Sequence, residues 1–173
     1  MQKLYVDDLP EESLSSRYAL VRVDFNVPIK TLPDKTISIY DDSRIRAALE
    51  TINYLTSRKV KVILCSHLGR PKGPSVSLSL ATVAARLREL LPSSTRVNFV
   101  ADCIGETVEV AKKCMNDGDV LLLENLRFYE EEKQNDPKFA SELVKGIDFY
   151  VNDAFGSAHR GDFFAISYHF VSK

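Results

Sequence analysis

Short, mainly apolar runs alternate along the chain with segments in which apolar side chains recur at helical spacing. The apolar runs are typical of β-strands and cover residues 18–23, 60–65, 96–100, 119–124 and 148–152. The amphipathic segments are typical of helices and cover residues 42–58, 80–91, 104–115 and 136–146. Asp41, Asp42 and Ser43 are available to cap the first helix, and Asp136 followed by Pro137 is a typical start for the last one.

Strands that are almost continuously apolar are usually buried on both faces of a sheet. Parallel neighbours need a long connection, which is usually a helix. The alternation therefore predicts an α/β fold: a doubly wound, mostly parallel sheet with helices on both faces, in a Rossmann-like three-layer sandwich. With 173 residues, the chain is long enough for a single lobe with its own core and too short for two ordinary domains.

Composition excludes several classes of partner. The 23 lysines and arginines nearly balance the 24 aspartates and glutamates, so the net charge of -1 gives no overall attraction to nucleic acid or to an anionic membrane. The three cysteines show no metal-ligand spacing and are expected to be reduced, buried thiols. No apolar run approaches the roughly 20 residues of a membrane span, and residues 1–12 lack the pattern of a signal or transit peptide. We expect a cytoplasmic protein, or a plastid protein from which a transit peptide has been removed.

Polar and charged side chains gather directly after four of the predicted strands, where open α/β sheets bind their ligands. They are Asp24 and Asn26 after the first strand, His67 and Arg70 after the second, Arg127 after the fourth, and His159 and Arg160 after the fifth, with Arg44 at the start of the first helix. Guanidinium groups hold carboxylate or phosphate through paired hydrogen bonds. The pattern predicts a cationic rim that binds a small, multiply charged anion.

Each of these side chains also has an ordinary structural explanation. An arginine on a loop is usually a solvated surface charge, a single histidine is usually structural, and Asp24 alone would serve to hydrogen-bond its own turn. The run at residues 130–133 is interpreted as a solvated charge run. Neither a Walker A loop nor a GxGxxG turn occurs, so no common phosphate-cradling loop is present. We expect no metal site and no tightly bound nucleotide in this chain.

Four strings in series, RVDFNVP, SHLGRPKG, LLLENLRFYEEE and NDAFGSAHR, resemble the phosphoglycerate kinase family over roughly residues 1–160. The resemblance implies a kinase of glycolysis, gluconeogenesis or the Calvin cycle, built from two lobes. The N-terminal lobe of this family binds 3-phosphoglycerate or 1,3-bisphosphoglycerate, and the C-terminal lobe binds Mg-ATP or Mg-ADP. The family is usually monomeric, and neither nucleic acid nor a membrane is an expected partner.

The resemblance also implies a role for seven positions. Asp24 and Asn26 are expected to contact the hydroxyl end of the substrate. The residues expected to hold its phosphate are His67, Arg70, Arg127 and Arg160. Arg44 is the expected catalytic residue, since it would lie near the transferring group and stabilise its charge while the substrate carboxylate acts as the nucleophile.

After Arg160 the sequence departs from the family pattern and continues as GDFFAISYHFVSK. We therefore expect a substrate-binding domain at residues 1–160 and a divergent tail at 161–173, which is either a short strand or the product of an altered reading frame, a retained intron or a truncated gene. Three functions remain open: an acceptor-binding lobe that is inactive alone, a non-catalytic anion-binding or regulatory module, and a truncated splice or gene-model product. An exposed lobe surface and an aromatic tail would favour self-association.

Overall fold

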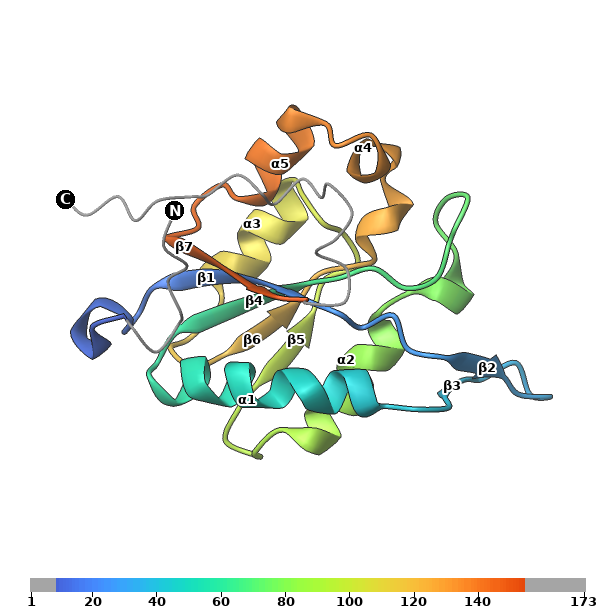
Figure 1. Ribbon diagram of the computed structural model, residues 1–173, viewed down its shortest axis with the longest axis horizontal. Helices are drawn as coiled ribbons and strands as arrows, with labels where there is room; N and C mark the ends of the chain where they lie inside the picture. Colours follow the sequence, from blue (N-terminus) through green and yellow to red (C-terminus); the bar gives the residue numbers. More distant parts are fainter. Residues whose placement is uncertain (1–8, 155–173) are drawn as a thin grey trace.

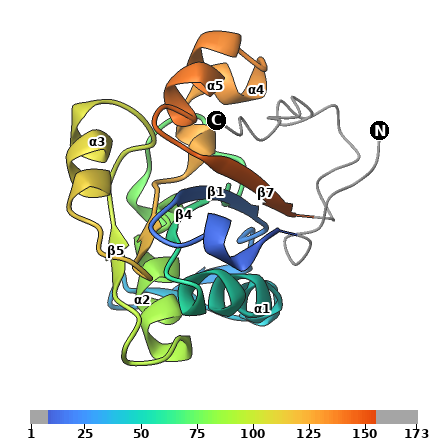
Figure 2. The same cartoon turned by 90° about the vertical axis from the view of Figure 1, so that its left-hand side faces the viewer.

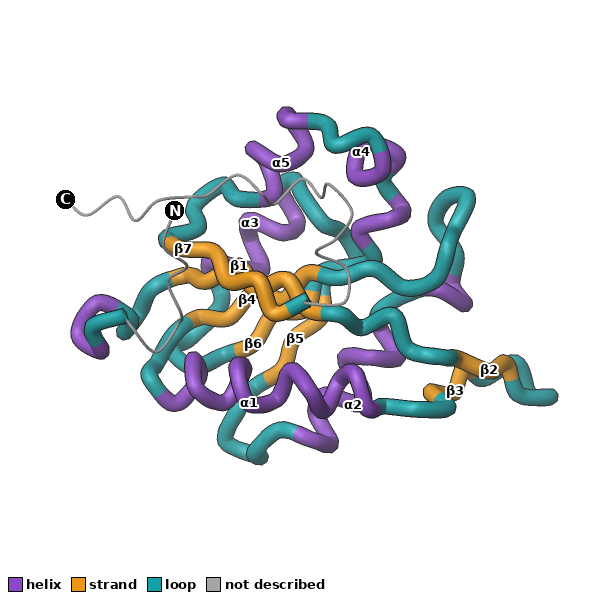
Figure 3. The backbone as a smooth tube through the Cα atoms, viewed as in Figure 1, coloured by secondary structure: helices purple, strands orange, loops and turns teal. Residues whose placement is uncertain are grey.

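A five-stranded sheet lies between two groups of helices in the computed structural model, which describes residues 9–154 (Figures 1 and 3). Its strands are all parallel and follow the order β5-β6-β4-β1-β7. The doubly wound α/β fold predicted from the sequence is thus confirmed. The strands are β1 (Tyr18–Val23), β4 (Lys61–Cys65), β5 (Val97–Phe99), β6 (Val120–Leu122) and β7 (Phe149–Asp153).

Helices cover both faces of this sheet (Figure 2). The side chains of α1 (Ser43–Ser57) and α2 (Ala81–Leu90) enter one core, and those of α3 (Glu106–Lys113) and α5 (Pro137–Leu143) enter the other. Alternate residues of a strand belong to alternate cores, so that Val62 and Leu64 face α1 and α2 while Ile63 faces α3 and α5. Burial on both faces favours apolar side chains at successive strand positions, which explains the nearly continuous apolar runs.

The remaining elements are short and lie in the connections. They are the 3-10 helices η2 (Glu11–Ser13), η3 (Val76–Leu78) and η4 (Leu126–Phe128), the single-turn helix α4 (Glu130–Lys133), and an antiparallel hairpin of β2 (Ile29–Thr31) and β3 (Ile37–Ile39). The sequence did not reveal this hairpin, because three-residue strands are too short to show a period of two.

Carboxylates hold the ends of two helices. Asp136 caps α5 by accepting two backbone N–H groups, at 2.7 and 3.0 Å, as the sequence predicted. At α1, Asp41 accepts the first helical N–H at 2.7 Å. The carboxylate of Asp42 instead pairs with Arg46 at 2.9 Å and with Arg86 of α2 at 2.8 Å, and so it links the two helices that share a face of the sheet.

The prediction of buried cysteines is correct for two of the three. Cys65 and Cys103 are buried and free, and burial raises the pKa of the Cys65 thiol to about 12. Cys114 is also free but exposed, so its predicted burial was wrong. Cys114 directly follows α3. It lies off the face of this helix on which Val108 is buried.

No helix among the described residues is long and apolar enough to cross a membrane. The predicted domain boundary at residue 160 and the tail at 161–173 lie outside the described residues, as do His159 and Arg160.

Candidate functional site

The carboxyl ends of the parallel strands meet at one edge of the sheet, toward the right of Figure 1. In the sheet order, β4 lies between β6 and β1, so the loops that follow these three strands start side by side. Asp24 follows β1, His67 follows β4 and Arg127 follows β6. The sheet therefore brings together three of the four loops that the sequence singled out.

Both carboxylate oxygens of Asp24 are engaged at this edge. Oδ2 forms an ion pair with Nη1 of Arg44, and Oδ1 accepts the N–H of Asn26 at 3.1 Å. Burial would raise the pKa of Asp24, but the hydrogen bonds from Arg44 and Asn26 and the charges of Arg44 and His67 together hold it below its usual value. Asp24 is thus a carboxylate that fixes Arg44, whose side chain stays half exposed.

Two loops are hydrogen-bonded to each other beneath the site. The Asn26 Oδ1 accepts the backbone N–H of Gly69 at 2.8 Å, and the Ser66 Oγ accepts the N–H of Phe25 at 2.9 Å. Gly69 has a φ of +64°, and a Cβ at this position would approach the side chain of Leu78 to 2.8 Å. The positive φ favours a glycine here, whereas the end of the flexible Leu78 side chain could move aside. The amide N–H₂ of Asn26 makes no hydrogen bond within residues 9–154, so it remains available to a ligand.

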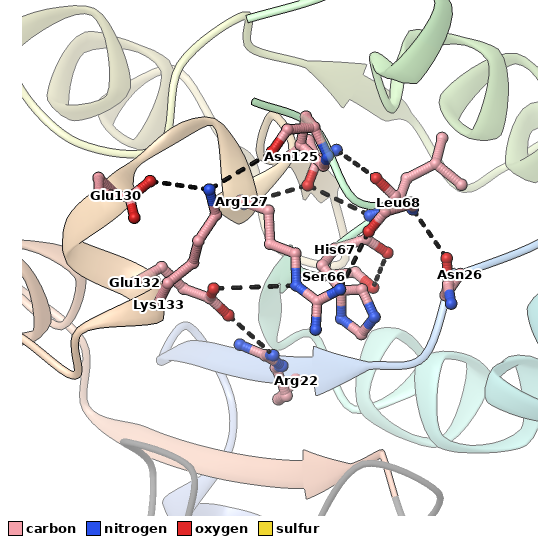
Figure 4. A network of polar contacts seen from close by, with 12 residues as sticks. Arg22, Asn26, Ser66, His67, Leu68, Asn125, Arg127, Glu130, Glu132 and Lys133 are labelled. Atoms are coloured by element: carbon pink, nitrogen blue, oxygen red, sulfur yellow. Dashed lines mark hydrogen bonds and ion pairs between the residues drawn. The ribbon is translucent and has the colours of Figure 1, made fainter. Parts of the chain in front are cut away.

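The fully buried Asn125 joins the β4 loop to the β6 loop (Figure 4). Its Oδ1 accepts the N–H groups of Leu68 at 3.2 Å and Arg127 at 3.1 Å. Its Nδ2 donates to the carbonyls of Leu68 at 2.8 Å and Leu78 at 2.9 Å. Every polar group of this amide is hydrogen-bonded to backbone. Asn125 therefore fixes the backbone of Arg127 relative to the loop that carries His67 and Arg70.

Arg127 belongs to a charged network that the sequence did not reveal. Its Nη1 donates to the carbonyl of Gly69 at 3.0 Å, and its Nε lies 4.0 Å from one carboxylate oxygen of Glu132 in α4. The other oxygen of Glu132 lies 3.4 Å from Nη2 of Arg22, an internal residue of β1. The Arg22 and Glu132 side chains are only 7% and 13% exposed, so the interpretation of residues 130–133 as a solvated charge run is wrong for Glu132.

One signal in the sequence could have revealed this network. Arg22 interrupts the otherwise apolar run of β1 and is 6% exposed. Arginine is almost never fully buried unless it is paired. A charged residue within a buried strand therefore required a partner, although its position in the sequence could not identify which acid supplied it.

His67 is buried beside these arginines, with 7% of its surface exposed. Burial, followed by the positive charges of Arg127 and Arg22, lowers the pKa of His67 to about 4; Asp24 opposes this shift and Arg44 adds to it. The imidazole is thus neutral near pH 7. Its Nδ1 is buried and has no hydrogen-bond partner, a rare condition in folded proteins.

Arg70 is exposed on the same loop and makes no hydrogen bond or ion pair with other described residues. It is therefore free to meet a ligand from solvent. Of the seven predicted site residues, the six that the structure describes lie on or beside the loops at one sheet edge. Arg160 is outside the described residues.

A separate cavity of about 860 Å³ lies between β3 and α2. Its lining includes Tyr40, Arg86 and Glu89 but none of the predicted site residues. Its lining holds three carboxylates, of Asp41, Asp42 and Glu89, and one guanidinium, of Arg86, which pairs with Asp42 and Glu89, so it does not suit an anion. The sheet edge is the better candidate, because its cationic groups converge and a buried ring nitrogen lacks a partner.

Comparisons with known proteins identify the family to which the chain is similar. The family model "Phosphoglycerate kinase" matches residues 6–166. The phosphoglycerate kinase of Dictyoglomus turgidum is 54% identical over 160 residues, which make up 92% of this chain and 39% of that protein. The chloroplastic enzyme of Volvox carteri is 52% identical over 91% of this chain and 33% of its own length. The cytosolic enzyme of Triticum aestivum is 51% identical over 91% of this chain and 38% of its own length.

Solved structures share the fold as well. The phosphoglycerate kinase of Pyrococcus horikoshii superposes with a TM-score of 0.79 and 31% identity over 93% of this chain and 39% of that chain. The phosphoglycerate kinase of Coxiella burnetii superposes with a TM-score of 0.73 and 31% identity, over 92% of this chain and 37% of that chain. This chain thus spans between 33% and 39% of the length of these curated relatives. Sequence and fold together show that the chain belongs to the phosphoglycerate kinase family.

Proposed function

We propose that this chain is the acceptor-binding lobe of a phosphoglycerate kinase, and that it holds 3-phosphoglycerate or 1,3-bisphosphoglycerate while a phosphoryl group is exchanged with ADP or ATP. The observation that carries the proposal is the convergence of arginines with the unpartnered Nδ1 of His67 at the carboxyl edge of the sheet. Membership of the family supports it. Because the chain spans only 33% to 39% of its relatives, the reaction of the whole enzyme is part of the proposal.

The hydroxyl end of the acceptor is assigned to Asp24 and Asn26. The Asn26 N–H₂ is available to donate to a hydroxyl oxygen, while its Oδ1 stays bound to Gly69. The low pKa of Asp24 keeps it ionised, so its carboxylate can accept a hydrogen bond from the same hydroxyl group.

The phosphate is assigned to His67, Arg70, Arg127 and Arg160. Arg127 is anchored through Nη1 to Gly69, which leaves its Nη2 and the second Nη1 hydrogen for an anion. The exposed Arg70 can close over the ligand from the solvent side. A phosphate dianion beside His67 would raise the pKa of its ring from about 4, because the added negative charge favours the protonated form.

Arg44 is assigned the catalytic role. Its ion pair with Asp24 holds one side of the guanidinium, and the half-exposed remainder faces solvent, from which a second reactant would approach. Phosphoryl transfer depends chiefly on positioning and charge stabilisation, and a guanidinium supplies both. The described residues contain no group of three or more His, Cys, Asp or Glu side chains that could hold a metal ion. We assign these residues only to the acceptor.

The test is a calorimetric titration of the 173-residue chain with 3-phosphoglycerate at low and high salt. We expect binding that weakens with salt, because exposed charges are screened. Arg70→Ala and Arg127→Ala should each weaken binding by about tenfold or more, since a charge-assisted hydrogen bond contributes about 1.5–3 kcal/mol. Arg17→Ala is the matched control, because Arg17 precedes the opposite end of β1 and pairs with Asp148. A folded chain that does not bind the acid would refute the proposal.

A coupled turnover assay separates the acceptor lobe from the alternative, an anion-binding regulatory module. We expect the 173-residue chain to bind the acid without turnover, and to support turnover only when a nucleotide lobe is supplied.

We place the protein in the cytoplasm, or in a plastid after removal of a transit peptide; its relatives include both a cytosolic and a chloroplastic enzyme. Self-association of the chain stays a prediction that light scattering would test.

A further inference from the structure

Three consecutive glutamates of α4 differ in their surroundings. The Glu130 side chain is 64% exposed and pairs at 2.8 Å with Lys133 of the same helical turn. Glu131 is exposed. The Glu132 side chain is only 13% exposed and points toward β1 and the β4 loop (Figure 4). Equal charges at neighbouring positions therefore have unequal environments.

Glu132 shares its carboxylate between two arginines that come from different parts of the chain. Oε1 lies 3.4 Å from Nη2 of Arg22, whose side chain is 7% exposed. Oε2 lies 4.0 Å from Nε of Arg127, which is an ion pair beyond hydrogen-bonding length. A buried guanidinium needs a compensating charge, and Glu132 provides it for Arg22. The same carboxylate lies on the Nε side of Arg127, away from the Nη groups.

The position of α4 is itself held by the loop that carries the candidate phosphate ligands. Lys133 Nζ donates to the carbonyl of Pro71 at 3.3 Å, and Arg127 Nη1 donates to the carbonyl of Gly69 at 3.0 Å. Arg127 is thus held at two points, by a backbone carbonyl and by Glu132. Its remaining N–H groups are those on Nη1 and Nη2.

We propose that Glu132 is a positioning residue of the acceptor site: its carboxylate holds the Arg127 guanidinium with the Nη groups turned to the ligand, and compensates the buried charge of Arg22 behind it. This inference rests on the proposed function. Glu132 contacts no ligand in this role and acts through Arg127. Simple electrostatics predicts the opposite effect, because removing a negative charge near an anion site should tighten binding.

The test compares Glu132→Gln with Glu130→Gln and Glu131→Gln, which remove the same charge from the same helix. Glu132→Gln should weaken 3-phosphoglycerate binding by about tenfold despite the more positive site, as expected when a supporting partner of a ligating side chain is lost. The two controls should stay within about twofold or bind slightly more tightly. In an Arg127→Ala background, the effect of Glu132→Gln should disappear, since a residue that acts through another is non-additive with it. Additive losses would indicate a merely structural role and overturn the proposal.

A second measurement needs no ligand and so separates this inference from the proposed function. In the ¹⁵N spectrum of arginine side chains, the Nε–H signal of Arg127 should shift in Glu132→Gln and stay in place in Glu130→Gln. An unmoved Arg127 signal, or unchanged or tighter binding in a folded Glu132→Gln protein, would overturn the proposal. If Glu132→Gln does not fold, Glu132→Asp keeps the charge and should give a smaller affinity loss of about threefold; no loss there would also overturn it. If the unmodified chain does not bind the acid, the proposed function fails, while the arginine signals still decide whether Glu132 holds Arg127.

Discussion

Replacing His67 by asparagine should remove much of the acid sensitivity of this fold. Burial and the nearby charges of Arg127 and Arg22 lower the pKa of His67 from 6.5 to about 4, with a further lowering by Arg44 and partial opposition from Asp24. The folded protein therefore binds fewer protons than the unfolded chain between these two values. Folding stability is fully present above the unfolded pKa and is lost as the pH falls toward the folded pKa.

The size of the effect follows from the two pKa values. Between pH ~7.5 and pH ~5, a histidine that titrates at 6.5 when unfolded and at about 4 when folded costs about 2 kcal/mol of unfolding free energy. Completing the titration below pH 4 brings the loss to about 3 kcal/mol. Small domains have total stabilities of about 5–15 kcal/mol, so the loss is a measurable share of the whole.

Urea unfolding at both pH values measures this loss in the unmodified chain and in His67→Asn. The unmodified chain should lose about 2 kcal/mol more than the variant on acidification, because asparagine does not titrate. An NMR titration of the His67 ring should show a pKa well below 6.5, and addition of 3-phosphoglycerate should raise it. Equal pH dependence in the two proteins, or a His67 pKa near 6.5, would refute the account of a neutral, buried imidazole.

Other substitutions test the remaining parts of the site and fold. In a full-length kinase, Arg44→Ala should lower kcat by about tenfold or more with little change in KM, because charge stabilisation is lost mainly in the transition state; a raised KM with unchanged kcat would contradict that role. Asn125→Asp turns the amide donor toward the carbonyls of Leu68 and Leu78 into an acceptor. It should cost about 2–4 kcal/mol in urea unfolding, and a neutral result would show that these bonds do not hold the loops. Asp136→Ala removes the cap of α5 and should cost about 1 kcal/mol, measured in the same way.

Local patterns in the sequence predicted the sheet and its helices because burial on both faces leaves a continuous apolar signature. The strand at Tyr18–Val23 was predicted at its observed bounds, α1 is shorter than predicted by one residue at each end, and β4 begins one residue later than predicted. The hairpin of β2 and β3 was missed because its strands are too short for a periodic signal. Cys114 was predicted to be buried because of its residue type. It is exposed, because burial beside a helix depends on which face of the helix the residue occupies.

The candidate site was predicted as a set of loops, and its internal contacts were not. Motif order and the rule that ligands bind beyond the carboxyl ends of strands placed Asp24, His67 and Arg127 together. Which of these side chains bind ligand and which bind one another depends on the spatial distances between residues that are far apart in the sequence. Asn26 was expected to contact the hydroxyl end of the substrate, and only the structure shows that its Oδ1 accepts the backbone N–H of Gly69.

The sequence by itself determined the α/β class, the order of the sheet strands and of the helices that cover them, and the edge of the sheet that carries the cationic residues, since periodicity and strand ends are local properties. Only the tertiary structure decided that Arg22 is buried, that its counter-charge is Glu132, 110 positions away, and that His67 is neutral with an unpartnered nitrogen. The physical reason is that burial and electrostatic pairing depend on which groups the fold brings within a few ångströms of each other. A run of three identical glutamates contains no information about that distance.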